Sequence, residues 1–183
     1  MEVEKVQREF ELQLEWKSFY LRPDTPAQGS PLPAAIRARM ADPNNPLKRR
    51  AAQMGLTMQD HELIPSTRPA HQATKWAGAQ GKLDAMHEQI LKRYWTLGED
   101  IGHWPALRAA AQDAGLDPDA MQEAVESGAF QPEVERDLEE ARDLGIAAVP
   151  TFVVGETHAI QGAQEAEVFR RLLRQLGVHA KGG

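Results

Sequence analysis

The residues best placed to serve a reaction lie in the segment 145–154, Gly-Ile-Ala-Ala-Val-Pro-Thr-Phe-Val-Val. A proline directly before a β-branched run is most often a plain strand start, since only about 5–6% of X-Pro bonds in folded proteins are cis. The order of the surrounding elements favours a more specific interpretation. A helix ends at Leu144-Gly145, and the run from Thr151 is followed by a hairpin and a terminal helix. Val149-Pro150 is therefore a candidate cis-proline loop, and the sequence alone leaves its isomer open.

The sequence contains no recognisable reactive group that could act together with this segment. There is no cysteine, which excludes disulfides, thiolate zinc sites and cysteine nucleophiles within these residues. The pair His87-Glu88 lacks the second histidine of a zinc-binding HExxH motif, and the six histidines are too scattered for a metal-binding spacing. Neither a glycine-rich phosphate loop nor a Gly-x-Ser-x-Gly motif is present. We expect no metal site, no cofactor and no catalytic residue in this chain.

Length and charge limit the class of protein. With 183 residues the chain can form one domain, or one domain with an insertion, around a sizeable core. Its net charge of −6 argues against nucleic-acid binding, which usually needs a basic face. No apolar run approaches the roughly 20 residues of a membrane span, and no signal peptide is visible at the start. We expect a cytoplasmic protein that binds neither nucleic acid nor membrane.

The two ends of the chain alternate helix and strand. Val3, Val6 and Phe10 have helical spacing, and no capping residue precedes them. Apolar and polar residues then alternate over 10–17, which predicts a strand with one covered face. The proline-rich stretch 21–33 is predicted to be a loop. Near the other end, residues 151–154 and 158–160 are predicted to form a hairpin, followed by a helix with Ala166, Phe169, Leu172, Leu173 and Leu176 inward.

The middle of the chain, from about 33 to 144, is predicted to be helical. Apolar side chains from Leu83 to Tyr94 recur at i, i+3, i+4, i+7, i+8 and i+11. Helices are expected to begin near Thr67 and at Asp117, each followed by a proline in the first turn. The pattern predicts an α/β domain, residues 1–30 and 145–183, interrupted by an all-helical insertion domain, residues 31–144.

These features together resemble the DsbA-like branch of the thioredoxin fold, which includes FrnE-type dithiol oxidoreductases and 2-hydroxychromene-2-carboxylate isomerases. The FrnE-type group is the closer match. The resemblance covers nearly the whole chain in the family's order. It rests on residues 14–24 (Leu-Glu-Trp-Lys-Ser-Phe-Tyr-Leu-Arg-Pro-Asp), 69–71 with 76–77, 94–101 (Tyr-Trp-Thr-Leu-Gly-Glu-Asp-Ile), 114–117, 149–154 and 162–164.

The resemblance implies a site whose catalytic part this chain lacks. Members begin with a strand that leads into Cys-Pro-x-Cys at a helix N-terminus, where the helix dipole lowers a thiol pKa. Met1 aligns inside that helix, so the first strand and the redox cysteines are expected to be missing, as in a truncated N-terminus. Val149, Pro150 and Thr151 match the family's cis-proline loop, which pairs with an extended substrate peptide. His71 and Trp76 are candidate groove-lining residues, although a lone helical histidine is more often a packing or surface residue.

Three functions follow as hypotheses. The first is a DsbA/FrnE-like thiol-disulfide oxidoreductase, acting on substrate proteins or small thiols such as glutathione, whose redox motif is absent from this chain. The second is a thiol-free relative that binds peptides or a small ligand without catalysis. The third is a glutathione-dependent isomerase with its catalytic serine upstream. The sequence leaves open whether this chain is itself an enzyme, which substrate is used, and whether the protein forms a homodimer.

Overall fold

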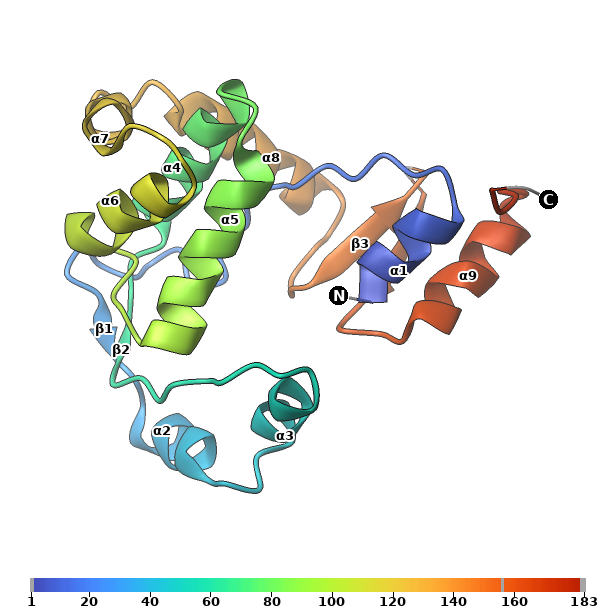
Figure 1. Cartoon of the computed structure of the whole chain (residues 1–183), viewed down its shortest axis with the longest axis horizontal. Helices are drawn as coiled ribbons and strands as arrows, with labels where there is room; N and C mark the ends of the chain where they lie inside the picture. Colours follow the sequence, from blue (N-terminus) through green and yellow to red (C-terminus); the bar gives the residue numbers. More distant parts are fainter. Residues whose placement is uncertain (1, 156, 182–183) are drawn as a thin grey trace. The chain divides into compact units, whose positions relative to one another are not determined.

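The described residues of the computed structural model, 2–155 and 157–181, divide into two units (Figure 1). The discontinuous unit comprises Met1–Leu21 and Glu139–Gly183, and the helical unit comprises Arg22–Leu138. The secondary structure is mixed α/β, as the sequence predicted, with helices far outnumbering the short strands in the described ranges. The unit boundaries, 21/22 and 138/139, differ by nine and six residues from the predicted 30/31 and 144/145. The domain assignment stays a prediction.

The discontinuous unit joins both ends of the chain around a hairpin. Helix α1 (Glu2–Glu9) and helix α9 (Ala166–Gln175) pack together beside β3 (Thr151–Val154) and β4 (His158–Gln161). The two strands are antiparallel, with Thr151 opposite Gln161 and Val154 opposite His158, which confirms the predicted hairpin. Six buried side chains form the core of this unit: Val6, Phe10, Ile160, Ala166, Phe169 and Leu173.

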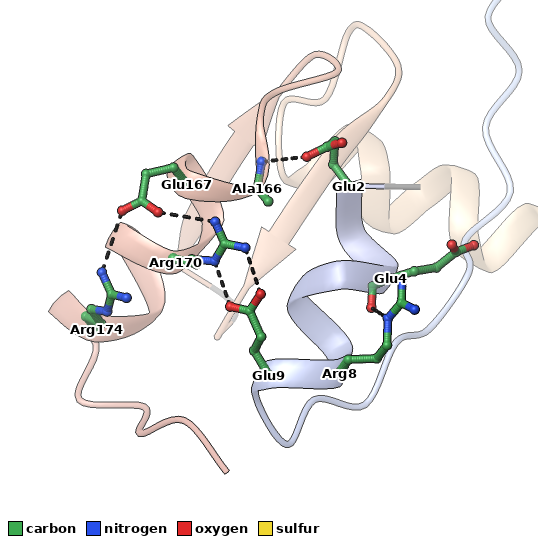
Figure 2. A network of polar contacts seen from close by, with 8 residues as sticks. All are labelled: Glu2, Glu4, Arg8, Glu9, Ala166, Glu167, Arg170 and Arg174. Carbon is green, nitrogen blue, oxygen red and sulfur yellow. Dashed lines mark hydrogen bonds and ion pairs between the residues drawn. The ribbon is translucent and has the colours of Figure 1, made fainter. Parts of the chain in front are cut away.

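Polar contacts between α1 and α9 hold the two chain ends together (Figure 2). The Arg170 guanidinium donates to both carboxylate oxygens of Glu9, at 2.6 and 2.7 Å. At the start of α9 the Ala166 N–H donates to Glu2 Oε2 at 3.1 Å. This second contact supplies an acceptor for an amide that has no partner inside its own helix, and it places a carboxylate at the positive end of the helix. The helix α1 predicted from Val3, Val6 and Phe10 is thus tied to α9 by charge as well as by packing.

The predicted strand over 10–17 is wrong. Only Phe10 takes part in a β-bridge, with Ala180, and residues 11–20 form no regular element. A strand needs a neighbour that accepts and donates along its length, and no described segment lies along 11–17 in this way. The alternation of apolar residues is kept only in part, because Leu14 is 37% exposed.

In the sequence, the helical unit lies between the two segments of the discontinuous unit. Its elements are β1 (Ser30–Pro31), α2 (Ala34–Ala41), α3 (Pro46–Gln53), β2 (Leu63–Ile64), α4 (Arg68–Ala79), α5 (Leu83–Leu91), the π-helix η1 (Lys92–Leu97), α6 (Trp104–Asp113), α7 (Pro118–Glu126) and most of α8 (Gln131–Asp143). The pairing of β1 with β2 is antiparallel and was not expected within a block predicted to be helical. Two-residue strands carry too little of a period-two pattern to be recognised in a sequence.

Helices α4 to α7 enclose the core of the helical unit. Ala73, Met86, Leu107 and Met121 are all fully buried there. The many small residues on α4 and α6 let each of these helices pack closely against α5 and α7. The predicted helix starts are confirmed, since Thr67 is the N-cap of α4 and the Asp117 side chain accepts from the N–H groups of Asp119 and Ala120.

The apolar stripe predicted from Leu83 to Tyr94 is buried only in part. Met86 and Ile90 are buried, but Leu91 is 40% exposed. The helix becomes a π-helix at Lys92, and this wider turn moves the following side chains out of the α-helical register. Leu176, predicted to face inward on the terminal helix, is also 38% exposed because α9 ends at Gln175.

Candidate functional site: the proline loop before β3

The loop that precedes β3 is built around Val149-Pro150, whose peptide bond is cis. On one side the Thr151 hydroxyl donates to the Ala148 carbonyl at 2.7 Å. On the other side the Gly162 N–H donates to the Pro150 carbonyl at 2.8 Å. The first bond closes the loop on itself, and the second fixes it against the end of β4.

Gly162 belongs to the segment 162–164 that resembles the family, but the sequence does not reveal its role in the loop. It follows the last paired residue of β4, and its amide extends the hairpin by one further bond to Pro150. Its φ of +84° is a backbone conformation that favours glycine. The next polar side chain, Gln164, donates to the Gln161 carbonyl at 2.9 Å and closes the turn into α9. Only the local combination of Gly and a short-range amide donor could have indicated this turn.

Val149 presents unused backbone groups at this loop. The residue is 48% exposed, and its N–H and C=O make no hydrogen bond with another described residue. An exposed donor and acceptor next to a strand can pair with an extended peptide, which then adds to the sheet edge. Val149, Pro150 and Thr151 carry no ionisable side chain, so binding here would depend on backbone pairing and shape.

The two other predicted site residues belong to the helical unit. Trp76 on α4 is 8% exposed and packs in the core of that unit. His71, also on α4, is half-buried, and its N–H donates to the Thr67 carbonyl at the helix start. The proline loop, in contrast, belongs to the discontinuous unit. The assignment of these two side chains to a groove stays a prediction.

The described residues contain neither a candidate metal centre nor a helix that could span a membrane. Within residues 2–155 and 157–181, no three His, Asp or Glu side chains come together in a way that could hold a metal ion. Over the same residues, every helix is too short or too polar to cross a bilayer.

With this geometry in place, comparison with known proteins identifies the fold. A family model for the DSBA-like thioredoxin domain matches residues 1–174. The chain belongs to the DsbA-like thioredoxin family. The resemblance found in the sequence is therefore confirmed, and the fold is the mixed α/β fold of DsbA-like proteins with a large share of helix.

The proteins similar to this chain include a probable DsbA oxidoreductase, an uncharacterised protein and an isomerase. The crystal structure of a probable DsbA oxidoreductase from Streptomyces coelicolor has a TM-score of 0.77 and 27% sequence identity, covering 88% of this chain and 74% of that chain. An uncharacterised protein of Bacillus subtilis, YwbO, is 25% identical over 166 residues, 89% of this chain and 82% of its own length. A 2-hydroxychromene-2-carboxylate isomerase from Sphingobium xenophagum is 32% identical over 84 residues, 46% of this chain and 43% of that protein.

Proposed function

We propose that this chain provides the polypeptide-binding part of a FrnE-type thiol-disulfide oxidoreductase, with the loop of Val149, Pro150 and Thr151 as the substrate-binding edge. The observation that carries the proposal is the exposed backbone of Val149, whose N–H and C=O have no partner among the described residues. A peptide that pairs with these groups in extended form would lie along the loop. The similarity to a DsbA oxidoreductase supports the assignment.

The thiol chemistry must come from outside these residues. In disulfide exchange a thiolate attacks one sulfur of a disulfide, a mixed disulfide forms, and the other sulfur leaves as a thiolate. None of the 183 residues is cysteine. The attacking thiolate would therefore belong to residues that this sequence does not contain, or to a small thiol such as glutathione. We expect the purified chain alone not to accelerate the reduction of insulin by dithiothreitol, and robust turnover would contradict the proposal.

Peptide binding can be tested by removing one backbone donor. In Val149→Pro the N–H at position 149 is lost, whereas Val149→Ala shortens the side chain and keeps the N–H. We expect an extended, Val- and Thr-rich ten-residue peptide to bind the parent chain and Val149→Ala alike. The Val149→Pro variant should bind about 3- to 10-fold more weakly, the effect of one hydrogen bond. A version of the peptide with N-methylated backbone amides should bind poorly to all three proteins.

The readout is a titration followed by backbone amide chemical shifts. Binding through the loop should shift the signals of Val149, Thr151 and Gly162 first. Equal affinity of Val149→Pro and Val149→Ala, with both folded by circular dichroism, would argue against backbone pairing at this loop. Cytoplasmic location is part of the same proposal and is checked by cell fractionation.

A glutathione-dependent isomerase is the second candidate. The 2-hydroxychromene-2-carboxylate isomerase is 32% identical over its 84 matched residues, against 25% for YwbO. Glutathione would then bind the chain with a defined saturation curve. The ten-residue peptide binds by backbone pairing, and we expect it not to compete with glutathione. A glutathione titration in the same chemical-shift experiment therefore separates the two functions.

A further inference from the structure

We propose that the N-terminal end of α4 forms a binding site for a small monocarboxylate with an apolar body, independent of the proline loop and of the function proposed for it. The site lies wholly within the helical unit. It is a cavity of about 390 Å³, a size typical of small-molecule sites. Seven residues line it: Thr25, Pro26, Ala27, Ser66, Arg68, Pro69 and Gly102.

The Ser66 hydroxyl is the first observation that indicates a ligand. Ser66 is 5% exposed, lines the cavity, and its hydroxyl makes no hydrogen bond with a described residue. The hydroxyl oxygen is nevertheless not among the side-chain atoms sealed from solvent without a partner. The Ser66 hydroxyl oxygen therefore keeps some contact with solvent. A hydroxyl at the wall of a cavity can donate a hydrogen bond to an acceptor on a bound ligand.

The start of α4 is the second observation. The first-turn amides of a helix lack partners inside the helix and carry a partial positive charge. The Thr67 side chain makes no capping hydrogen bond here, and the first turn of α4 contains no acidic residue. Helix α7 is the opposite case in the same unit, because Asp117 accepts from two first-turn amides and Asp119 adds a second carboxylate. The N-terminus of α4 thus has no carboxylate of its own, whereas the N-terminus of α7 has Asp117 and Asp119.

The charges around the cavity favour a ligand that carries a single negative charge. The Arg68 side chain lines the cavity and is held in place by a hydrogen bond from its Nη2 to the Pro23 carbonyl at 2.7 Å. Asp100 lies next to Gly102, but one of its oxygens accepts the Gly102 N–H at 2.8 Å and the other lies 3.4 Å from His103 Nε2. One arginine and one helix end, with a carboxylate nearby, suit a carboxylate better than a doubly charged phosphate.

The rest of the lining explains the apolar body of the ligand. Pro26, Ala27 and Pro69 offer carbon surface and no side-chain polar groups. Gly102 lets its segment pack closely on the Ser66 backbone, because a Cβ at this position would lie 2.9 Å from the Ser66 carbonyl oxygen. We therefore infer a carboxylate held by Ser66 Oγ, the α4 amides and Arg68, with its hydrocarbon chain against the two prolines.

The test is a titration of the full ¹⁵N-labelled chain with hexanoate, followed by amide chemical shifts. The signals of Ser66, Arg68, Ala70 and Gly102 should shift along one saturation curve. The capped first-turn amides of α7, Asp119 and Ala120, should stay unshifted. Hexanamide, of the same shape without the charge, should bind at least tenfold more weakly, and inorganic phosphate should not displace hexanoate.

Two substitutions connect this binding to the named groups. Ser66→Ala should raise the dissociation constant of hexanoate about 3- to 10-fold, the effect of one lost hydrogen bond, while leaving the circular dichroism spectrum unchanged. The control is Ser127→Ala, since the Ser127 hydroxyl donates to the Ala124 carbonyl away from the cavity; its dissociation constant should equal that of the parent chain. Arg68→Gln should weaken binding and remove most of its dependence on salt.

Three results would overturn the site. They are equal binding of hexanamide and hexanoate, shifts that centre on another region, and an unchanged dissociation constant for folded Ser66→Ala. None of these measurements involves Val149 or the peptide. Failure of the carboxylate site is therefore distinguishable from failure of the proposed function.

Discussion

Arg170 on α9 and Glu9 on α1 form a two-pronged ion pair, Nε to Oε2 at 2.6 Å and Nη2 to Oε1 at 2.7 Å (Figure 2). The pair joins residues from opposite ends of the sequence at the partly exposed contact between α1 and α9. Arg170 also reaches Glu167 on its own helix at 3.3 Å. The hydrogen bond from Arg170 is the main reason that the pKa of Glu9 lies below its ordinary value of 4.5. Because this geometry is bidentate, it fixes the direction of the contact as well as its charge.

The first prediction concerns acid stability. A carboxylate whose pKa is lower in the folded state stabilises that state above its unfolded pKa, and the effect is lost as the pH falls through the folded pKa. Glu9→Gln should therefore lower the melting temperature at pH 7, and the difference from the parent chain should shrink as the pH falls below 4.5. Thermal unfolding at pH 7, 4.5 and 3 measures this. Glu11→Gln, on an exposed residue of the neighbouring segment, serves as the control and should have little effect at any pH.

The second prediction concerns a buried ion pair in the helical unit. Lys75 Nζ on α4 lies 2.5 Å from Asp137 Oδ2 on α8, and the two side chains are only 14% and 7% exposed. Asp137→Asn leaves the Lys75 charge buried without its counter-ion, which should cost about 3–5 kcal/mol of unfolding free energy. The double variant Lys75→Met with Asp137→Leu should recover most of that loss, because two apolar side chains need no pairing.

Urea unfolding of the parent, single and double variants provides the comparison. The exposed pair Lys48 and Asp60, 2.6 Å apart, gives a matched control. Asp60→Asn should cost less than about 1 kcal/mol, as surface pairs usually do. If Asp137→Asn and Asp60→Asn destabilised the chain equally, burial would not be what makes the first pair important.

The third prediction concerns the core of the helical unit. Leu107 on α6 is fully buried among the residues of α4, α5 and α7. Leu107→Ala should cost about 2–5 kcal/mol, from lost transfer free energy and the cavity left behind. Leu97→Ala removes the same atoms from a side chain that is 48% exposed, and it should change the unfolding free energy by less than about 1 kcal/mol. A comparable loss at both positions would show that the core is not packed as described.

How far the sequence predicts this molecule depends on the range of the interaction involved. Local signals were reliable. Asp117 followed by Pro118 gave a helix start that the structure confirms, because a side-chain cap and a fixed proline φ act within one turn. The hairpin of β3 and β4 was predicted for the same reason. The strand over 10–17 failed because alternation describes one covered face and says nothing about a hydrogen-bonding neighbour.

The residues of the candidate sites also differ in whether a local sequence signal marks them. Val149 and Pro150 were found because a recognisable sequence motif surrounds them. The bond from Gly162 to Pro150 joins two parts of a turn and was not foreseen. Ser66 and Gly102 are 36 positions apart and carry no motif, so only the folded chain brings them to one cavity. The π-helix at Lys92–Leu97 was missed because its wider turn leaves the residue composition unchanged.

The last prediction concerns His61, whose ring stacks on Tyr94 of η1 with centroids 4.0 Å apart and lies edge-on to Trp95. Its Nε2 is buried without a partner among the described residues. Loss of solvent lowers the pKa of His61 below 6.5, and the nearby charge of Asp60 offsets part of this effect. The unfolded chain therefore binds a proton more readily, and stability should fall as the pH decreases from about 7 through the folded pKa.

Replacing His61 with Phe keeps a flat ring for the stack and removes the titration. The urea midpoint of the parent chain should fall between pH 7.5 and 5.5, and the midpoint of His61→Phe should fall less. Some slope should remain in the variant, because burial also lowers the pKa of His87. The exposed His179 gives the control: His179→Phe should follow the parent chain at every pH. A His61→Phe slope equal to that of the parent would mean that the stacked ring accepts its proton without opening the cluster.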